Sequence, residues 1–190
     1  MAESRPEQYK TVRRYNNPGH AHFLTFSCYK RLPLLNDERF LSFLGQGVHR
    51  ACSELYYDLW AYVFMPDHVH LLVKPLQDSY FIAELLRKIK QPVAMRSLKV
   101  LKKERSPILD KLALDRKKKG KYRFWQAGGG HDLNIWTPSK AVGKAEYCHR
   151  NPVIRGLVSD PAAWRWSSYR WLEIGSREDE PLQVNTRSLH

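Results

Sequence analysis

The sequence predicts an α+β fold in which helices cover one face of an antiparallel sheet, and two observations point to it. Runs rich in aromatic and β-branched residues alternate with stretches whose apolar positions lie three and four residues apart. These segments follow one another in the order strand, helix, strand, strand, helix, strand, helix. That order, with a basic helical insertion and a C-terminal extension, is typical of a ferredoxin-like or RRM-like sandwich.

The first half of the chain supplies three expected strands and one helix. Residues 20–29 (HAHFLTFSCY) follow an Asn-Pro-Gly turn and form the first strand. An apolar stripe with helical spacing then runs from about residue 37 to 55. Residues 58–64 and 68–74 are two strand candidates joined by Met-Pro-Asp, which predicts a hairpin.

The second half supplies two helices and a further strand. A long helical pattern covers about residues 79–104, and Pro92 should kink or interrupt it. The last strand is expected near residues 122–126, before a Gly-Gly-Gly turn at 128–130. Thr137 followed by proline predicts a helix start, and this helix should end before Pro152.

Length and cysteine usage bound the class of protein. With 190 residues, the chain suits one domain, expected over 15–175, with tails at 1–14 and 176–190. Cys28, Cys52 and Cys148 are scattered and odd in number, which favours reduced thiols over a disulfide framework. No signal peptide or membrane span is evident, so we expect a soluble, cytoplasmic protein with no membrane partner.

The net charge of +13 is concentrated in one segment. Residues 87–123 hold fifteen Lys and Arg side chains against three acidic ones. Such a block builds a local positive field, which favours nucleic acid over the alternative of a solvated helix face and loop. The candidate DNA-binding residues are Arg87, Lys88, Lys90, Lys99, Lys102, Lys103, Arg116, Lys117, Lys118, Lys119, Lys121 and Arg123.

Aromatic side chains that follow the basic block are candidates for stacking on bases. They are Tyr122, Phe124, Trp125 and Trp136. Ordinary core packing is the expectation for most of them.

Two histidines interrupt the apolar run YVFMPDHVHLLVK. His68 and His70 are two apart on an expected core strand, so their imidazoles face the same side, where they could bind a divalent ion. Buried polar groups are costly unless paired, so the setting favours a function. A second pair, His20 and His22, lies at a strand entrance and is expected at the surface.

The helix AVGKAEYCHRNP carries further candidates. Tyr147 and Asn151 are four apart and share one helix face, so a phenol would lie one turn from an amide oxygen that could bind a hard ion. Each residue also has a purely structural interpretation. Tyr147 would be a core tyrosine, and Asn151 would cap the helix before Pro152.

Together these segments resemble a known family. FMPDHVHLLVKP, the basic helix, EYCHRNPVIRGLV and PAAWRWSSYRW are similar to the REP-associated tyrosine transposases, which belong to the single-tyrosine HUH transposases. The resemblance covers roughly residues 15–172. Asn151-Pro152 and the Trp-x-Trp-Ser-Ser-Tyr ending favour the REP-associated branch, whereas Cys148 replaces a more usual aliphatic residue.

The resemblance implies a metal-dependent enzyme that cleaves and rejoins single-stranded DNA. Tyr147 would be the nucleophile and form a 5′-phosphotyrosine link, while His68, His70 and Asn151 would bind Mg²⁺ or Mn²⁺. Lys144, one turn before Tyr147, is a candidate to support the nucleophile or the phosphate. The implied partner is a short palindromic, REP-like hairpin, and we favour a monomer although relatives can complete their sites across a dimer.

Three alternatives remain open at this point. The chain could be a nucleic-acid-binding module without chemistry, because RNA-recognition domains share this layout. It could be a metal-dependent phosphodiesterase that uses water. It could also be a replication or relaxase-type nickase with the same site.

Overall fold

A four-stranded antiparallel sheet forms the centre of the computed structural model, which describes residues 15–114, 121–176 and 180–186. The strands are β1 (Ala21–Ser27), β2 (Tyr57–Phe64), β3 (His68–Pro75) and β4 (His131–Ile135). Their order across the sheet is β2-β3-β1-β4, and each neighbouring pair is antiparallel. This arrangement confirms the predicted α+β, ferredoxin-like class.

Helices connect and extend these strands. They are α1 (Glu38–Glu54), α2 (Ile82–Lys103), α3 (Ile108–Leu112) and α4 (Pro138–Ile154), with short helical turns at Tyr29–Arg31, Leu34–Asn36, Pro161–Ala163 and Arg170–Ile174. The Asp37 side chain accepts a hydrogen bond from the backbone N–H of Arg39 (2.9 Å) and caps α1. The helix α2 runs through Pro92 as one element.

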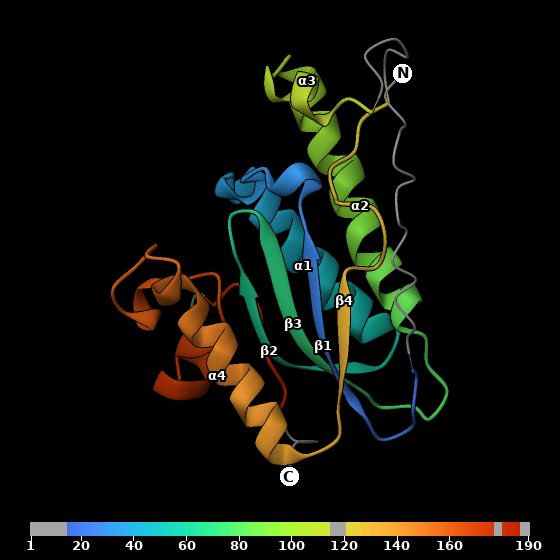
Figure 1. Cartoon of the computed structure of the whole chain (residues 1–190), viewed down its shortest axis with the longest axis vertical. Helices are drawn as coiled ribbons and strands as arrows, with labels where there is room; N and C mark the ends of the chain where they lie inside the picture. Colours follow the sequence, from blue (N-terminus) through green and yellow to red (C-terminus); the bar gives the residue numbers. More distant parts are fainter. Residues whose placement is uncertain (1–14, 115–120, 177–179, 187–190) are drawn as a thin grey trace, which may run out of the picture.

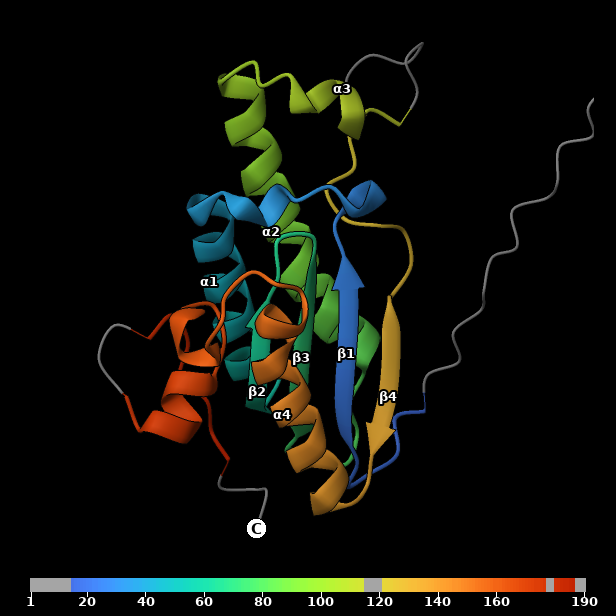
Figure 2. The same ribbon diagram turned by 60° about the vertical axis from the view of Figure 1, so that its left-hand side comes forward.

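Helices cover both faces of the sheet, not one face as predicted. Figures 1 and 2 show α1 and α2 behind the sheet and α4 in front of it. The core under α1 and α2 includes Leu24, Phe26 and Leu71, and a second core under α4 includes Phe23 and Val63. The reason lies in β2, where every residue is buried. A strand whose side chains are buried on both faces of the sheet needs elements packed against both faces.

The last strand lies later in the chain than predicted. Residues 122–126 make only isolated bridges, through Tyr122 and Trp125, whereas β4 begins at His131. Phe124 and Trp125 are buried in the core beside α2, so their apolar character serves packing instead of sheet pairing. The true strand has a weak pattern, because only Ile135 of its five residues is fully buried.

The helix α4 continues through Pro152, where we expected it to stop. Pro152 lies in the last turn, where its missing N–H removes a single i→i−4 backbone hydrogen bond, and the helix tolerates this loss. Gly156 ends the helix with a φ of 66°, and its N–H donates to the carbonyl of Val153 while the N–H of Leu157 donates to that of Pro152. These two bonds form a Schellman motif, so the glycine sets the helix end.

The C-terminal region covers the free edge of β2. The N–H of Phe64 donates to the carbonyl of Trp166 (2.8 Å), and the N–H of Asn185 donates to that of Leu59 (2.9 Å). Within the expected tail at 176–190, Leu182 and Val184 are buried in the core. The C-terminal extension therefore pairs an edge strand that would otherwise be open to another chain.

Gly130 is a position where only glycine fits, and we expect Gly130→Ala to be strongly destabilising. Its φ is 74°, and an added Cβ would overlap the carbonyl oxygen of Thr25 on β1. Gly128 has a similar φ of 84° but open space around it, so Gly128→Ala is the matched control. Urea unfolding should show a loss of about 1–2 kcal/mol for Gly128→Ala and at least about 3 kcal/mol for Gly130→Ala. Equal losses would mean that the clash is absorbed by a backbone shift.

Candidate active site

His68 and His70 lie side by side on β3 and face α4. Both are buried, and their ring centroids are 4.8 Å apart with the rings perpendicular. Val69 between them points into the opposite core. The strand alternation therefore places both imidazoles on one face, as the sequence predicted.

Each imidazole is oriented by a partner on its Nδ1 atom. Nδ1 of His68 lies 2.5 Å from Oδ1 of Asp67, and Nδ1 of His70 lies 2.8 Å from the hydroxyl oxygen of Thr25. Thr25 is the direct cross-strand partner of His70 in the β1–β3 pairing. An Nδ1–H that donates to such a partner leaves the Nε2 lone pair free, which is the usual arrangement of metal-binding histidines.

Burial keeps both rings neutral. It lowers the pKa of His70 to about 3, with the neighbouring His68 adding to the effect. Burial also lowers the pKa of His68, although the hydrogen bond to Asp67 opposes it. Neutral imidazole is the form that binds a metal ion.

The helix α4 brings Tyr147 and Asn151 to the histidines. The helix starts where predicted, since the side chain of Thr137 accepts a hydrogen bond from the N–H of Lys140 (3.4 Å). Buried Cys148 packs the helix onto the sheet. The Tyr147 ring lies 5.4 Å from the His70 ring, and Nδ2 of Asn151 lies 3.2 Å from Nε2 of His70. A single chain thus brings all four predicted residues together. Tyr147 is 42% exposed and so is not a core tyrosine, and Asn151 lies inside α4, whose C-cap is Arg155.

The donor set fits a divalent metal ion. Asn151 is buried, and its Oδ1 atom has no hydrogen-bond partner. Because amide oxygen and nitrogen positions are interchangeable by rotation, the oxygen can face the two Nε2 atoms. Within the described ranges, no cluster of three His, Cys, Asp or Glu side chains forms a competing site. Two imidazole nitrogens and one amide oxygen are donors that a divalent metal ion can use.

Tyr147 remains accessible to a large substrate. Its side chain is 42% exposed, and its ring contacts the edge of Phe23, with centroids 6.0 Å apart. The ammonium of Lys144 lies 5.1 Å from the Phe23 ring centroid and 5.6 Å from that of Tyr147. The Lys144 ammonium therefore lies beside the Tyr147 ring.

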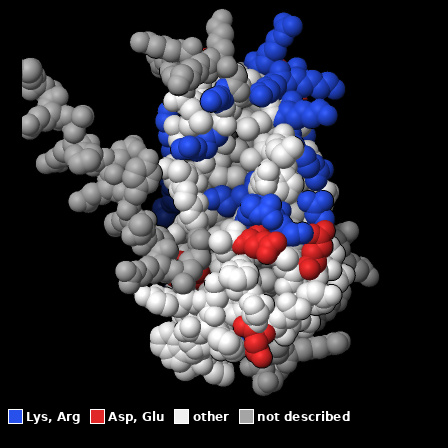
Figure 3. All heavy atoms as spheres, turned by 90° about the vertical axis from the view of Figure 1, so that its right-hand side faces the viewer, with Lys and Arg blue, Asp and Glu red and all other residues white. Residues whose placement is uncertain are grey.

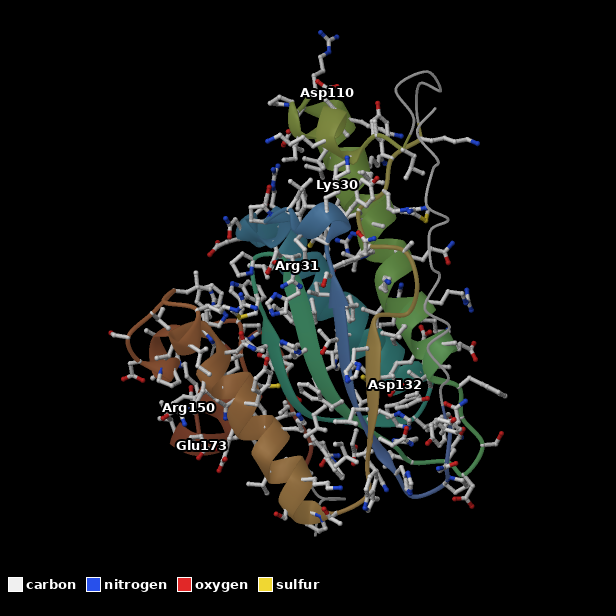
Figure 4. All side chains as sticks on the ribbon, viewed as in Figure 1. Lys30, Arg31, Asp110, Asp132, Arg150 and Glu173 are labelled. Carbon is white, nitrogen blue, oxygen red and sulfur yellow. The ribbon has the colours of Figure 1, made fainter. Side chains whose placement is uncertain are left out.

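Sequence reasoning missed the residues that support the histidines from other elements. Arg31 makes an ion pair with Asp67 (2.8 Å) and donates to the hydroxyl of Ser27 (2.7 Å). Figure 4 shows Arg31 and Lys30 just beyond the end of β1. Asp67 could have been found from its place before His68, whereas Thr25 and Arg31 become neighbours only through strand pairing.

The basic residues lie mainly on α2, across the sheet from Tyr147. Arg116, Lys117, Lys118 and Lys119 fall outside the described residues. Figure 3 shows Lys and Arg gathered over the upper part of one side of the molecule. Lys99, Lys102 and Lys103 occupy the C-terminal half of α2, which in Figure 1 extends past the end of the sheet where β3 begins. The basic surface thus approaches the histidines from that end.

A groove of about 480 Å³ lies between α2 and residues 122–129. Arg87, Lys90 and Arg123 line it together with Tyr122 and Trp125. Lys88 instead forms an ion pair with Glu54 (2.5 Å), and Lys121 is exposed. Among the described candidates, Arg87, Lys90 and Arg123 therefore lie in the groove, and Lys99, Lys102 and Lys103 lie at the end of α2.

His22 is buried, contrary to the expectation of a surface histidine. Its Nδ1 lies 2.8 Å from Oδ1 of Asp132, and its Nε2 lies 2.8 Å from the hydroxyl of Tyr80. The Tyr80 hydroxyl in turn donates to the carbonyl of Asn17 (2.8 Å). These partners satisfy both ring nitrogens, so the burial needs no metal.

A family model described as "Transposase IS200 like" matches residues 17–128, more than half of the chain, including both histidines. The chain belongs to the IS200-like transposase family. Members of this family are DNA-binding, DNA-cleaving transposases. The matched range ends before α4, so the positions of Tyr147 and Asn151 rest on the geometry described above.

Two solved structures are similar to this IS200-like chain, and the first of them supports its fold. One described as "Structure of the REP associates tyrosine transposase bound to a REP hairpin" aligns with a TM-score of 0.65 and 18% identity, covering 85% of this chain and 83% of that chain. A putative transposase from Deinococcus radiodurans R1 aligns with a TM-score of 0.43 and 20% identity over 76% and 93% of the two chains. No curated protein matches the chain. None of the helices in the described ranges has the length and apolarity that a bilayer crossing needs.

Proposed function

We propose that this IS200-like transposase is a metal-dependent single-stranded DNA transesterase that works through a covalent 5′-phosphotyrosine intermediate. The observation that carries the proposal is the meeting of Tyr147, His70 and Asn151 in one small space, with His68 beside His70 on the same strand face. Each of these groups has a role in phosphodiester exchange. A binding module without chemistry would have no use for them.

In the first step the phenol oxygen of Tyr147 attacks the scissile phosphorus. The bond from phosphorus to the 3′ oxygen breaks, the phenol proton is lost, and the departing 3′ oxygen takes up a proton. In the second step a 3′-hydroxyl attacks the phosphotyrosine and restores both the phosphodiester and Tyr147. Each step exchanges one phosphoester for another, so neither ATP nor a redox partner is required.

His68, His70 and Asn151 would hold Mg²⁺ or Mn²⁺ at the phosphate. When bound, such an ion neutralises charge on the phosphate oxygens and helps to fix the phosphorus in line with the nucleophile. Thr25 and Asp67 hold the imidazoles in the orientation that presents Nε2. Lys144 adds a positive charge beside the phenol, where it favours the approach of a phosphate.

The substrate we propose is DNA with a palindromic, REP-like hairpin. The protein in the similar structure is bound to such a hairpin. In this chain the cationic end of α2 and the groove beside it would contact the hairpin backbone, which supplies affinity and little sequence choice. One chain contributes both the tyrosine and the histidines, which favours a monomer.

One assay tests the proposal. The protein is incubated with Mg²⁺ and end-labelled hairpin DNA carrying a single-stranded flank, and the products are run on a denaturing gel. We expect a covalent protein–DNA adduct that disappears when EDTA is added. Cleavage without an adduct would identify a hydrolase that uses water, and retention without cleavage would identify a binding module.

The cationic cluster at the end of α2 should set the salt dependence of DNA binding. Replacing Lys99, Lys102 and Lys103 by alanine should flatten the slope of log affinity against log salt by roughly 2 to 3, because each lost phosphate contact removes about 0.7–0.9. Arg50→Ala on α1, whose side chain lies within 4.0 Å of Glu54, is the control and should leave the slope unchanged. An unaltered slope in the triple variant would remove this cluster from the interface.

A further inference from the structure

The face of the sheet that carries the histidines is only half covered. The main contacts of α4 on this sheet are with β2 and β3, and Figure 2 shows β1 and β4 beside it without a helix in front. On that half, Phe23 pairs with Leu133 and Thr25 pairs with His131; His131 and Leu133 are exposed, whereas Phe23 is buried. We call this strip, made of Phe23, Thr25, His131 and Leu133, the β1–β4 shelf.

One side of the shelf is bordered by a row of polar side chains on α4. Lys140, Lys144, Tyr147 and Asn151 are spaced by four, three and four residues, so they lie along one helix face. Lys144 and Tyr147 both contact Phe23 on the shelf. The row therefore runs along the shelf from the metal-binding residues towards the start of α4.

An exposed tryptophan stands at the far end of this row. Trp136 follows β4 directly, is 57% exposed, and has the ammonium of Lys140 3.6 Å from its ring centroid. Its neighbour Ile135 already fills the second core, so Trp136 is not required for packing. A large, exposed aromatic ring beside a lysine is a combination that single-stranded nucleic acid sites use, with bases on rings and phosphates on cations.

We propose that the β1–β4 shelf binds the single-stranded part of the DNA next to the scissile phosphate, with a base stacked on Trp136. This inference rests on the proposed function and adds a defined path for the substrate. Lys140 and Lys144 would contact consecutive phosphates of that strand. From Lys140 to Tyr147 the helix rises about 10 Å, which corresponds to about three nucleotides of a stacked strand. The hairpin then lies at the opposite, cationic end of the sheet.

Two variants of Trp136 test this path by binding alone. Anisotropy is measured in EDTA with a labelled hairpin that carries a single-stranded flank, and with the same hairpin without it. Trp136→Ala should weaken binding of the flanked DNA by about 5- to 100-fold, the range of one stacking contact, while Trp136→Phe keeps an aromatic ring and stays within about threefold. Phe81→Ala removes an equally exposed ring at the start of α2 and should change nothing.

The hairpin without a single-stranded flank shows whether a loss of affinity comes from the lost stacking contact or from another cause. We expect Trp136→Ala to bind it as the unaltered protein does. Full affinity of Trp136→Ala for the flanked DNA, or an equal loss for both DNAs, would overturn the proposal. Because no metal or cleavage is involved, this outcome is separate from failure of the adduct assay.

Discussion

Tyr147→Phe should abolish the covalent adduct and lower DNA cleavage by at least about a thousandfold, the size of effect seen when a nucleophile is removed from an enzyme. The phenylalanine ring can keep the edge contacts with His70 and Phe23, which involve ring atoms and not the hydroxyl. The side chain is also partly exposed. We therefore expect unfolding in urea to change by less than about 0.5 kcal/mol.

Binding and chemistry should separate in this variant. Affinity for hairpin DNA should remain within about threefold, because the proposed DNA contacts come from cations and from Trp136. Tyr56→Phe, at another exposed tyrosine, is the matched control and should cleave normally. An adduct that persists in Tyr147→Phe would place the nucleophile elsewhere in the chain.

His70→Ala should have the second largest effect, through loss of metal binding. Removing one of three proposed ligands should weaken Mn²⁺ binding by at least about a hundredfold in calorimetry, since even the partners behind a ligand are worth 10- to 100-fold. Cleavage at ordinary Mg²⁺ concentrations should fall below detection while the protein still binds DNA. His49→Ala, at an exposed histidine of α1, should retain full activity.

Misfolding could also explain a loss of activity in His70→Ala, because this substitution leaves a cavity beside Asn151. A milder variant separates the two causes. Thr25→Val keeps the shape of the side chain and removes only the hydroxyl that lies 2.8 Å from Nδ1 of His70. It should weaken Mn²⁺ binding by about 10- to 100-fold and raise the Mg²⁺ concentration needed for cleavage. Unchanged metal affinity in a folded His70→Ala would refute the assignment of this ligand.

Several features could be predicted from local sequence alone because they depend on local physics. The period-two pattern of β3 places His68 and His70 on one face, and the four-residue spacing on α4 places Tyr147 and Asn151 on one face. Thr137 and Pro138 begin α4 through their capping chemistry. Spacing of this kind depends only on the geometry of a single element.

The order of elements determined the α+β class, but local signals misplaced the last strand. Residues 122–126 have the stronger β pattern, yet their aromatic side chains are used in packing beside α2. His131–Ile135 pairs with β1 despite its weak pattern, because Gly130 allows the backbone to approach Thr25 closely. Which of the two segments pairs with β1 depends on the surfaces that surround β1, and the sequence of neither segment reveals those surfaces.

By itself the sequence determined the histidine pair, the tyrosine–amide pair, the concentration of positive charge and the resemblance to single-tyrosine transposases. The tertiary structure alone decided that α4 crosses the opposite face of the sheet to reach His70 and that Thr25 supports that ring. It also decided that His22 is buried and that the shelf beside α4 stays open. Contacts between residues far apart in the chain depend on which apolar surfaces cover one another, and that balance is a property of the whole core.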